Sequence, residues 1–479
     1  MFRRIINLLA GNFINKIVLF LFLPIFTKFL VTSEYAIYAN LNIFYSVVGM
    51  LYFLGLQQSL YSYYYKNPHP NFRFTLISSS YITLLAAGIL FSSVIILFRA
   101  QLSKFITLSE NNSELLILMS VILFFNMIFA FTISLLNVME KSNKSVVLTA
   151  LNNFTFIGIL GFFAITQNFS VFNIFLSQLI SITLFAVVSI FIIGNEVRNN
   201  EVTHKKYYDL DLIKPLLKFG LIMLPATLAM LLMRSADRYM ITYLDAESLN
   251  SAGIYAVSYK LGMIVQMIVS VVSIIFFPYA LKQKDSQKQE EAINNIFKYY
   301  ILFGGIISAL SILFTPEIFE LLVNGDFRIG AKLTFIGIFS TYLHGVFNII
   351  NLPFYAKQKA NKIALAVISG SILNIILNYI LIPKYSLMGA GIASIIAYVY
   401  LILFNYFAVR KMYKIVFDLR ILFISIFILS ILALINYNSY FSFGTMIVKI
   451  SGVIIFFSFI MIYLIKSNKI NDLKNLMRK

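Results

Sequence analysis

Long apolar stretches, each bounded by charged or turn-forming residues, constrain the fold of this chain more than any other feature. A helix that spans a bilayer needs about 20 predominantly apolar residues, and the stretches here are continuous and rich in Ile, Leu and Phe. They lack the alternation typical of β-barrel strands. Of the 479 residues, 60% are apolar and 12% charged, against about 25% charged in soluble domains. The sequence therefore predicts an all-α polytopic membrane protein and excludes a water-soluble enzyme.

The stretches predict about fourteen transmembrane helices. The first is expected to be an uncleaved span, because its apolar run continues to about Leu30, contains Lys16 and lacks the small-residue cleavage site of a secretory signal. The expected spans are 5–30, 36–62, 75–98, 114–138, 145–166, 170–194, 219–243, 252–281, 297–315, 331–356, 362–383, 388–409, 420–437 and 444–465.

The distribution of Lys and Arg predicts the orientation of these spans. With both termini on one side of the membrane, the loops on that side hold 27 of the 38 Lys and Arg residues, and the opposite loops hold 5. Cytoplasmic loops carry an excess of positive charge. Both termini are therefore predicted to lie in the cytoplasm, in a multi-pass protein of the cytoplasmic (inner) membrane. The same bias explains most of the net charge of +19 without a nucleic-acid partner.

Two short matches indicate an internal repeat. The segment AIYA at 36–39 recurs as GIYA at 253–256, and the span that begins NKSVVLTALNNF recurs as one that begins NKIALAVISGSI, at offsets of 217 and 218. Six spans separate equivalent positions, so both copies cross in the same direction, as in transporters with parallel repeats. The predicted organisation is an N-terminal lobe, a cytoplasmic linker, a C-terminal lobe, and two further helices with a cytoplasmic tail, at 1–198, 199–218, 219–410 and 411–479.

The chain lacks the residues that most catalytic sites need. It contains no Cys and three His, and no nucleotide-binding, metalloprotease or nucleophile-elbow motif is present. No loop is long enough to fold as a domain. The prediction is a secondary transporter rather than an enzyme, with no metal and no cofactor, driven by a proton or sodium gradient.

The seventh span contains charges that a membrane disfavours. Arg234 lies three residues before Asp237 and four before Arg238, a spacing that puts all three on one side of a helix. Lys16, near the middle of the first span, and Lys260, within the eighth, add two cations. A charged residue at the centre of a membrane helix costs about 2.5–3.5 kcal/mol on insertion scales, so it usually faces a cavity or a partner.

These residues predict a cationic cavity. Four cations accompany one acid, Asp237, and Arg in particular suits phosphate because its planar guanidinium donates two parallel hydrogen bonds. The expected ligand is an anion, bound by Lys16, Arg234, Arg238 and Lys260. Two alternatives remain open: Asp237 neutralises one Arg and the cluster joins helices, or Asp237 couples transport to an ion.

Three segments resemble one known family. LPIFTKFLVTSEYAIYANL at 23–41, SADRYMITYLDAESLNSAGIYAVSYKLG at 235–262 and NYILIPKYSLMGAGIAS at 378–394 are similar to the corresponding motifs of the Wzx-type polysaccharide-biosynthesis flippases, which belong to the MOP exporter superfamily. The resemblance extends along nearly the whole chain. It departs at Ala36, where many relatives have Gly.

The resemblance implies a MATE-like fold of fourteen helices, with two six-helix lobes around a central cavity. It implies alternating access that moves an undecaprenyl-pyrophosphate-linked oligosaccharide of O-antigen, lipopolysaccharide or capsule type, together with a glycan polymerase and a chain-length regulator as partners. The alternatives are a multidrug or small-anion antiporter of the same superfamily, a membrane glycan polymerase or ligase, and a scaffold for glycan enzymes.

Overall fold

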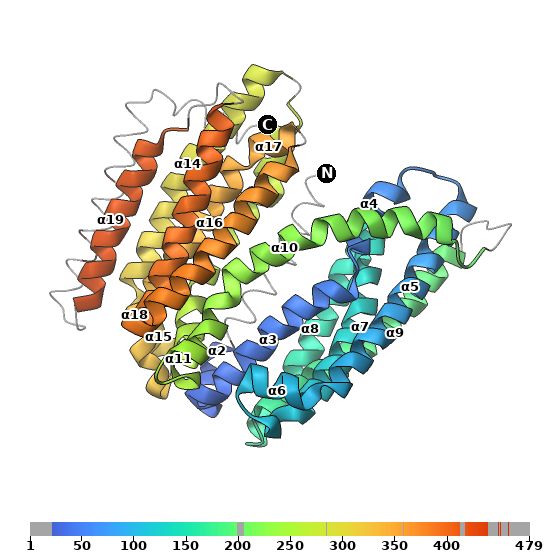
Figure 1. Cartoon of the computed structure of the whole chain (residues 1–479), viewed down its shortest axis with the longest axis horizontal. Coiled ribbons are helices and arrows are strands. Elements are labelled where there is room, and N and C mark those ends of the chain that lie inside the picture. Colours follow the sequence, from blue (N-terminus) through green and yellow to red (C-terminus); the bar gives the residue numbers. More distant parts are fainter. Residues whose placement is uncertain are drawn as a thin grey trace. The chain divides into compact units, whose positions relative to one another are not determined.

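The structure is a computed structural model, and it describes residues 22–198, 206–283, 285–357, 359–411 and 417–438, with positions 449, 451 and 458. All regular structure within these residues is helical (Figure 1). Nine helical segments of this part of the chain are long and apolar enough to cross a membrane. The predicted all-α fold class is therefore confirmed.

The chain packs as two compact units. The first unit is Met1–Gly253 with Val367–Ser386, and the second unit is Ile254–Ala366 with Leu387–Lys479. The first unit includes the long helix α10 (Leu210–Leu244), which begins within the segment predicted as a linker. The boundaries of the two repeat-related lobes stay a prediction.

In the first unit, α7 (Ser113–Val138) is the central helix and packs against α5, α8 and α9 (Figure 1). A second set of contacts joins α10 to α3 and α4. The other elements of this unit are α2 (Leu23–Phe29), α3 (Thr32–Tyr52), α4 (Leu56–Tyr64), α5 (Pro70–Leu97), α6 (Arg99–Thr107), the 3-10 helix η1 (Glu110–Asn112), α8 (Ser142–Ile165) and α9 (Val171–Arg198).

In the second unit, α16 (Thr334–Ile350) is the most deeply buried helix and packs against α12 and α14, while α14 also contacts α19. The unit contains α12 (Gly262–Val271), the π-helical segment η2 (Val272–Phe276), α13 (Phe277–Leu281), α14 (Ser286–Leu313), α15 (Thr315–Leu322), the 3-10 helix η3 (Gly325–Leu333), α17 (Leu352–Ala356) and α19 (Leu419–Asn438). Two helices, α11 (Leu249–Lys260) and α18 (Ala360–Arg410), contribute residues to both units.

Each predicted span from 36–62 to 420–437 has a helical counterpart, but several are interrupted. The second span divides into α3 and α4 at Leu54 and Gly55, which both have positive φ angles. The eighth divides into α11, α12, η2 and α13. Pro278 lies in the first turn of α13, a position where proline is common because the first N–H groups of a helix have no partner within it. Apolar patterning predicts where a span lies, whereas these breaks depend on local backbone geometry.

The eleventh and twelfth spans form one helix, α18, with a kink at Ser386, whose φ is 50°. The first predicted span is described only from residue 22, and the fourteenth only at the three isolated positions. One of these, Lys449, is buried, and its Nζ lies 2.6 Å from a carboxylate oxygen of Glu317 in α15.

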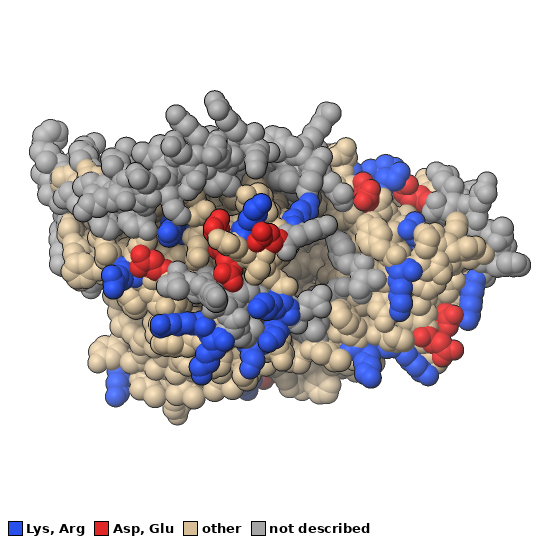
Figure 2. Space-filling model, turned by 90° about the horizontal axis from the view of Figure 1, so that it is seen from above, with Lys and Arg blue, Asp and Glu red and all other residues tan. Residues whose placement is uncertain are grey.

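The outward surfaces of the helices suit a lipid environment. Large apolar side chains such as Ile89, Leu90, Phe162 and Phe191 are more than half exposed, which in a water-soluble monomer would form an unusually large apolar patch. Basic side chains gather at helix ends instead. The face seen in Figure 2 carries many Lys and Arg side chains, and Lys141 is one of the exposed cations between helices.

Candidate functional site

The charged residues of the seventh span lie on α10, in the half nearer its C-terminus. The helix begins at Asp209, whose carboxylate accepts the backbone N–H of Asp211 at 3.1 Å, and it continues to Leu244. At 1.5 Å per residue, Arg234 lies about 15 Å and Arg238 about 9 Å from the end of the helix. Both cations therefore lie well inside a helix that is long and apolar enough to cross a membrane.

Arg234 is an exposed side chain on this helix. It makes no hydrogen bond and no ion pair with any residue that the structure describes. Asp237 therefore does not neutralise Arg234, although the two are three residues apart. A guanidinium in this position has all five of its N–H donors available to a ligand.

Asp237 and Arg238 are more enclosed than Arg234. The Asp237 side chain is 1% exposed, and its Oδ1 accepts the backbone N–H of Arg238 at 2.9 Å. Arg238 is half-buried, and its charge interacts with the fully buried Tyr35 of α3. The Asp237 carboxylate is therefore buried within the protein, whereas Arg234 is exposed and Arg238 is half-buried.

Hydrogen bonds hold this part of α10 against α3 and α6. The Tyr239 hydroxyl donates to the backbone carbonyl of Asn40 at 2.7 Å. The Asn40 amide donates to the Thr242 hydroxyl at 3.1 Å and to the carbonyl of Ile106 at 3.2 Å. Because Asn40 is fully buried, breaking these bonds would leave unsatisfied polar groups. The network fixes the position of the helix that carries Arg238.

Aromatic side chains of α2, α3 and α9 form a cluster that includes Tyr35. The Phe26 ring stacks on Tyr38 with centroids 5.0 Å apart and meets Tyr35 edge-on at 6.3 Å. Tyr38 also contacts Phe175 of α9. This packing orients Tyr35, the side chain of α3 with which the charge of Arg238 interacts.

The predicted site residues are only partly brought together. Arg234, Asp237 and Arg238 lie on adjacent turns of α10 in the first unit. Lys260 is the last residue of α11, half-buried and in the second unit. Lys16 lies outside the described residues. The four-cation cavity therefore remains a prediction.

Sequence reasoning missed Tyr35 and Asn40 as neighbours of the site. Asn40 did carry a signal, because a buried amide inside an apolar span needs hydrogen-bond partners. Those partners, Tyr239 and Thr242, lie about 200 residues away in the sequence, so spacing along the chain could not identify them.

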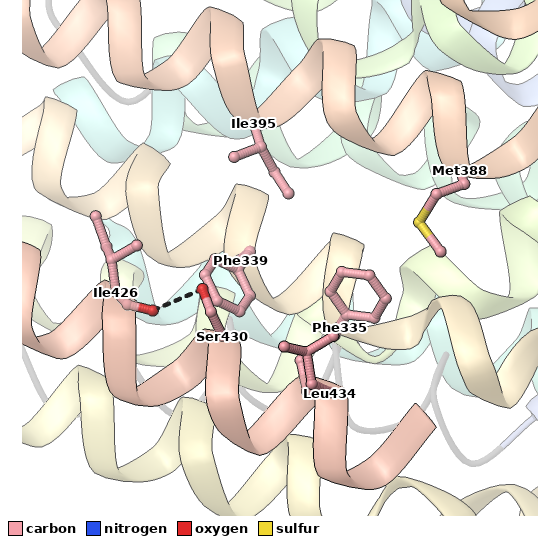
Figure 3. A pocket seen from close by; sticks show the side chains of 8 residues that line it. Phe335, Phe339, Met388, Ile395, Ile426, Ser430 and Leu434 are labelled. Carbon is pink, nitrogen blue, oxygen red and sulfur yellow. Dashed lines mark hydrogen bonds between the residues drawn. The ribbon is translucent and has the colours of Figure 1, made fainter. Parts of the chain in front are cut away.

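The second unit contains a cavity of about 410 Å³, which we call the apolar cavity. Its one hydroxyl, from Ser430, donates to the Ile426 carbonyl of its own helix at 2.8 Å (Figure 3). Apolar side chains from α16, α18 and α19, including the thioether of Met388, form the rest of the wall (Figure 3). The lining residues are Phe335, Phe339, Met388, Ile395, Ile426, Ser430, Ala433 and Leu434.

Among the described residues, no three His, Asp or Glu side chains lie close enough together to hold a metal ion. The described residues offer positive charge at Arg234 and Arg238, and an apolar surface at the cavity of the second unit.

The sequence matches one family model, described as polysaccharide biosynthesis protein, over residues 1–283. No protein among those with curated descriptions matches significantly.

Several solved structures share the fold. The lipid II flippase MurJ in an inward closed conformation is 18% identical, with a TM-score of 0.71, over 95% of this chain and 99% of that one. An inward-facing multidrug resistance MATE family transporter of the MOP superfamily is 13% identical, with a TM-score of 0.66, over 83% and 95% of the two chains. A MOP superfamily transporter from Pyrococcus furiosus is 14% identical, with a TM-score of 0.61, over 85% and 95%. The predicted MATE-like fold is confirmed.

Proposed function

The chain belongs to the polysaccharide biosynthesis protein family, and from this membership we propose that this multi-pass membrane protein is a flippase for lipid-linked glycans. The proposed cargo is an undecaprenyl-pyrophosphate-linked oligosaccharide repeat unit of O-antigen or capsule type. The fold that it shares with the lipid II flippase supports a transporter rather than an enzyme.

The observation that carries the proposal is Arg234. Its guanidinium is exposed and has no protein partner among the described residues, on a helix long and apolar enough to cross a membrane. An unpaired cation inside a membrane is costly unless it serves a ligand. A pyrophosphate is a suitable ligand, because its oxygens match the parallel donors of a guanidinium.

In the proposed mechanism, Arg234 and Arg238 bind the pyrophosphate, and Lys16 and Lys260 add positive charge to the same cavity. Alternating access then carries pyrophosphate and sugars from the cytoplasmic to the outer leaflet, driven by an ion gradient. Asp237 either couples this ion or maintains the position of Arg238. Its hydrogen bond to the Arg238 backbone supports the positioning role.

The lipid part of the cargo needs an apolar surface. The apolar cavity of the second unit has a wall of hydrocarbon and one hydroxyl that already donates within its own helix. A prenyl chain loses no hydrogen bonds on entering such a cavity, which supports a lipid-linked cargo over a free sugar.

The second candidate is a multidrug or small-anion antiporter, favoured by the likeness of the fold to a multidrug resistance transporter. Arg234 argues against cationic drugs, because an exposed guanidinium repels a cation. The proposed location is the cytoplasmic membrane with both termini inside, and a glycan polymerase with its chain-length regulator would act on the product at the outer face.

The test is mass spectrometry of undecaprenyl-linked lipids from a deletion strain. Accumulation of complete repeat units facing the cytoplasm supports the flippase and identifies the glycan. Complete units that reach the outer face without polymerising would instead indicate a polymerase. A lipid pool identical to that of the parent strain would contradict the flippase and favour the antiporter.

A further inference from the structure

The first unit contains a second cavity, of about 210 Å³, which we call the polar cavity. It lies among α3, α4, α7 and α10, and α10 also carries Arg234 and Arg238. Its lining residues are Tyr45, Ser46, Gly49, Met50, Phe53, Gln57, Asn126, Leu224 and Thr227.

The polar groups of this cavity are uncharged, and three of them are available. The Tyr45 hydroxyl and the amides of Gln57 and Asn126 make no hydrogen bond with any residue that the structure describes. Polar side chains that are partly enclosed normally find partners. Three such groups from three helices, all lining one cavity, therefore indicate a ligand that both donates and accepts hydrogen bonds.

The described lining residues carry no charge, which favours one class of ligand. None of them is a carboxylate, the usual ligand of a metal ion, and none is a Lys or Arg, the usual partner of phosphate. Amides and hydroxyls beside Phe53, Met50 and Leu224 are instead the combination that binds a neutral molecule with hydroxyl groups and an apolar ring face. A sugar has both.

The volume of the cavity limits how much sugar it holds. About 210 Å³ lies below the roughly 300–1,000 Å³ of pockets that enclose drug-sized ligands, so one monosaccharide ring fits better than an oligosaccharide. Thr227 at its wall precedes Arg234 on the same helix by seven residues, or about 10 Å along the helix axis. A sugar close to the pyrophosphate can span this distance.

We propose that the polar cavity binds one uncharged sugar ring of the glycan and thereby selects among lipid-linked glycans. The inference rests on the proposed flippase function, because it takes the pyrophosphate to be bound at Arg234. The described part of the wall then favours a neutral sugar at that position of the glycan, since these residues offer a carboxylated sugar no cation to pair with.

The test compares two lipids on the full-length protein in nanodiscs: undecaprenyl pyrophosphate, and the glycan-bearing lipid extracted from the deletion strain. The variants are Gln57→Leu and Asn126→Leu, which remove hydrogen bonds, and Gly49→Val, which fills the cavity without removing any. Gly49 lines the cavity, and a Cβ atom there would make an ordinary contact of 3.4 Å with Leu123, so the position accepts a larger side chain. Gln178→Leu on α9 is the matched control, a half-buried amide outside the cavity.

Each cavity variant is expected to bind the glycan-bearing lipid about threefold to tenfold more weakly than the wild type. Binding of undecaprenyl pyrophosphate should not change, and Gln178→Leu should affect neither lipid. Unchanged glycan binding in all three cavity variants, or an equal loss for both lipids, would overturn the inference while leaving the flippase intact. A wild type that binds neither lipid would overturn the proposed function itself.

Discussion

The hydroxyl of Thr32 donates a hydrogen bond of 2.8 Å to the amide oxygen of Asn250, and the two residues are 218 positions apart. This separation equals one of the two offsets, 217 and 218, of the internal repeat that the sequence predicts from other segments. In the predicted repeat, Thr32 and Asn250 would therefore occupy equivalent positions of the two copies.

Backbone packing reinforces this contact. A Cβ atom added to Gly253 would lie 1.9 Å from the carbonyl oxygen of Thr32, so only glycine allows the two segments to approach so closely. In the predicted orientation this contact lies at the outer end of the spans. In the proposed alternating access, release of cargo to the outer leaflet requires this contact to open.

A reversible crosslink between these positions should stop transport. The wild-type chain has no Cys, so the double variant Thr32→Cys, Asn250→Cys carries the two thiols alone. We expect a short thiosulfonate crosslinker to reduce glycan-lipid translocation in proteoliposomes at least tenfold, and a reductant to restore it. The single-Cys variants under the same treatment are the controls. Full translocation by the crosslinked protein would show that this end does not open.

Arg234 is expected to be essential for binding pyrophosphate. Arg234→Ala should weaken binding of undecaprenyl pyrophosphate by about tenfold or more, because a charge-assisted hydrogen bond contributes about 1.5–3 kcal/mol. Arg234→Lys should recover part of the affinity through charge without the paired geometry. The control is Arg99→Ala, which removes an exposed arginine at the start of α6. Glycan export that survives both Arg234→Ala and Arg238→Ala would remove these residues from the site.

The contact between Gly55 and Gly220 should tolerate no side chain. A Cβ on Gly220 would lie 2.6 Å from the Gly55 carbonyl carbon, and Gly55 itself has a φ of 71°. We expect Gly220→Ala to lower the free energy of unfolding by about 1–3 kcal/mol through overpacking, measured as a fall in Tm of the purified protein.

Gly158→Ala is the matched control for this prediction. Gly158 lies in α8 with nothing within 4 Å of its Cβ position, so the change should leave Tm unchanged or raise it, since Ala favours a helix by about 1 kcal/mol over Gly. Equal Tm values for the two variants would contradict the close approach of α4 and α10.

The ion pair between Lys449 and Glu317 should be sensitive to the loss of either partner. The Lys449 side chain is 5% exposed and that of Glu317 31%. Removing one partner of a buried pair typically costs about 3–5 kcal/mol, because the other charge is left without compensation. We expect Lys449→Met to lower Tm strongly and the double variant Lys449→Met, Glu317→Gln to recover part of the loss. A double variant less stable than either single one would exclude this explanation.

Much of the fold follows from the sequence, because membrane insertion depends on local composition. The apolar stretches alone predicted the spans that the structure describes as helices, and the one with unusual charges, α10, was identified by Arg234, Asp237 and Arg238. The interruptions were not predicted. At the break, Gly55 has a left-handed backbone conformation. Gly55 also packs closely against Gly220, a contact between distant residues that the sequence does not reveal.

The charged site on α10 could be predicted from the sequence, whereas the polar cavity could not. Charges in an apolar stretch are visible one residue at a time, since each is costly wherever the rest of the chain lies. Neutral groups such as Gln57 and Asn126 carry no such signal, and what distinguishes them is a shared cavity formed by separate helices. The sequence by itself determined that the chain crosses a membrane and where it carries cations, and its orientation stays a prediction. Only the tertiary structure decided which side chains meet, because contacts between distant helices depend on packing rather than on local composition.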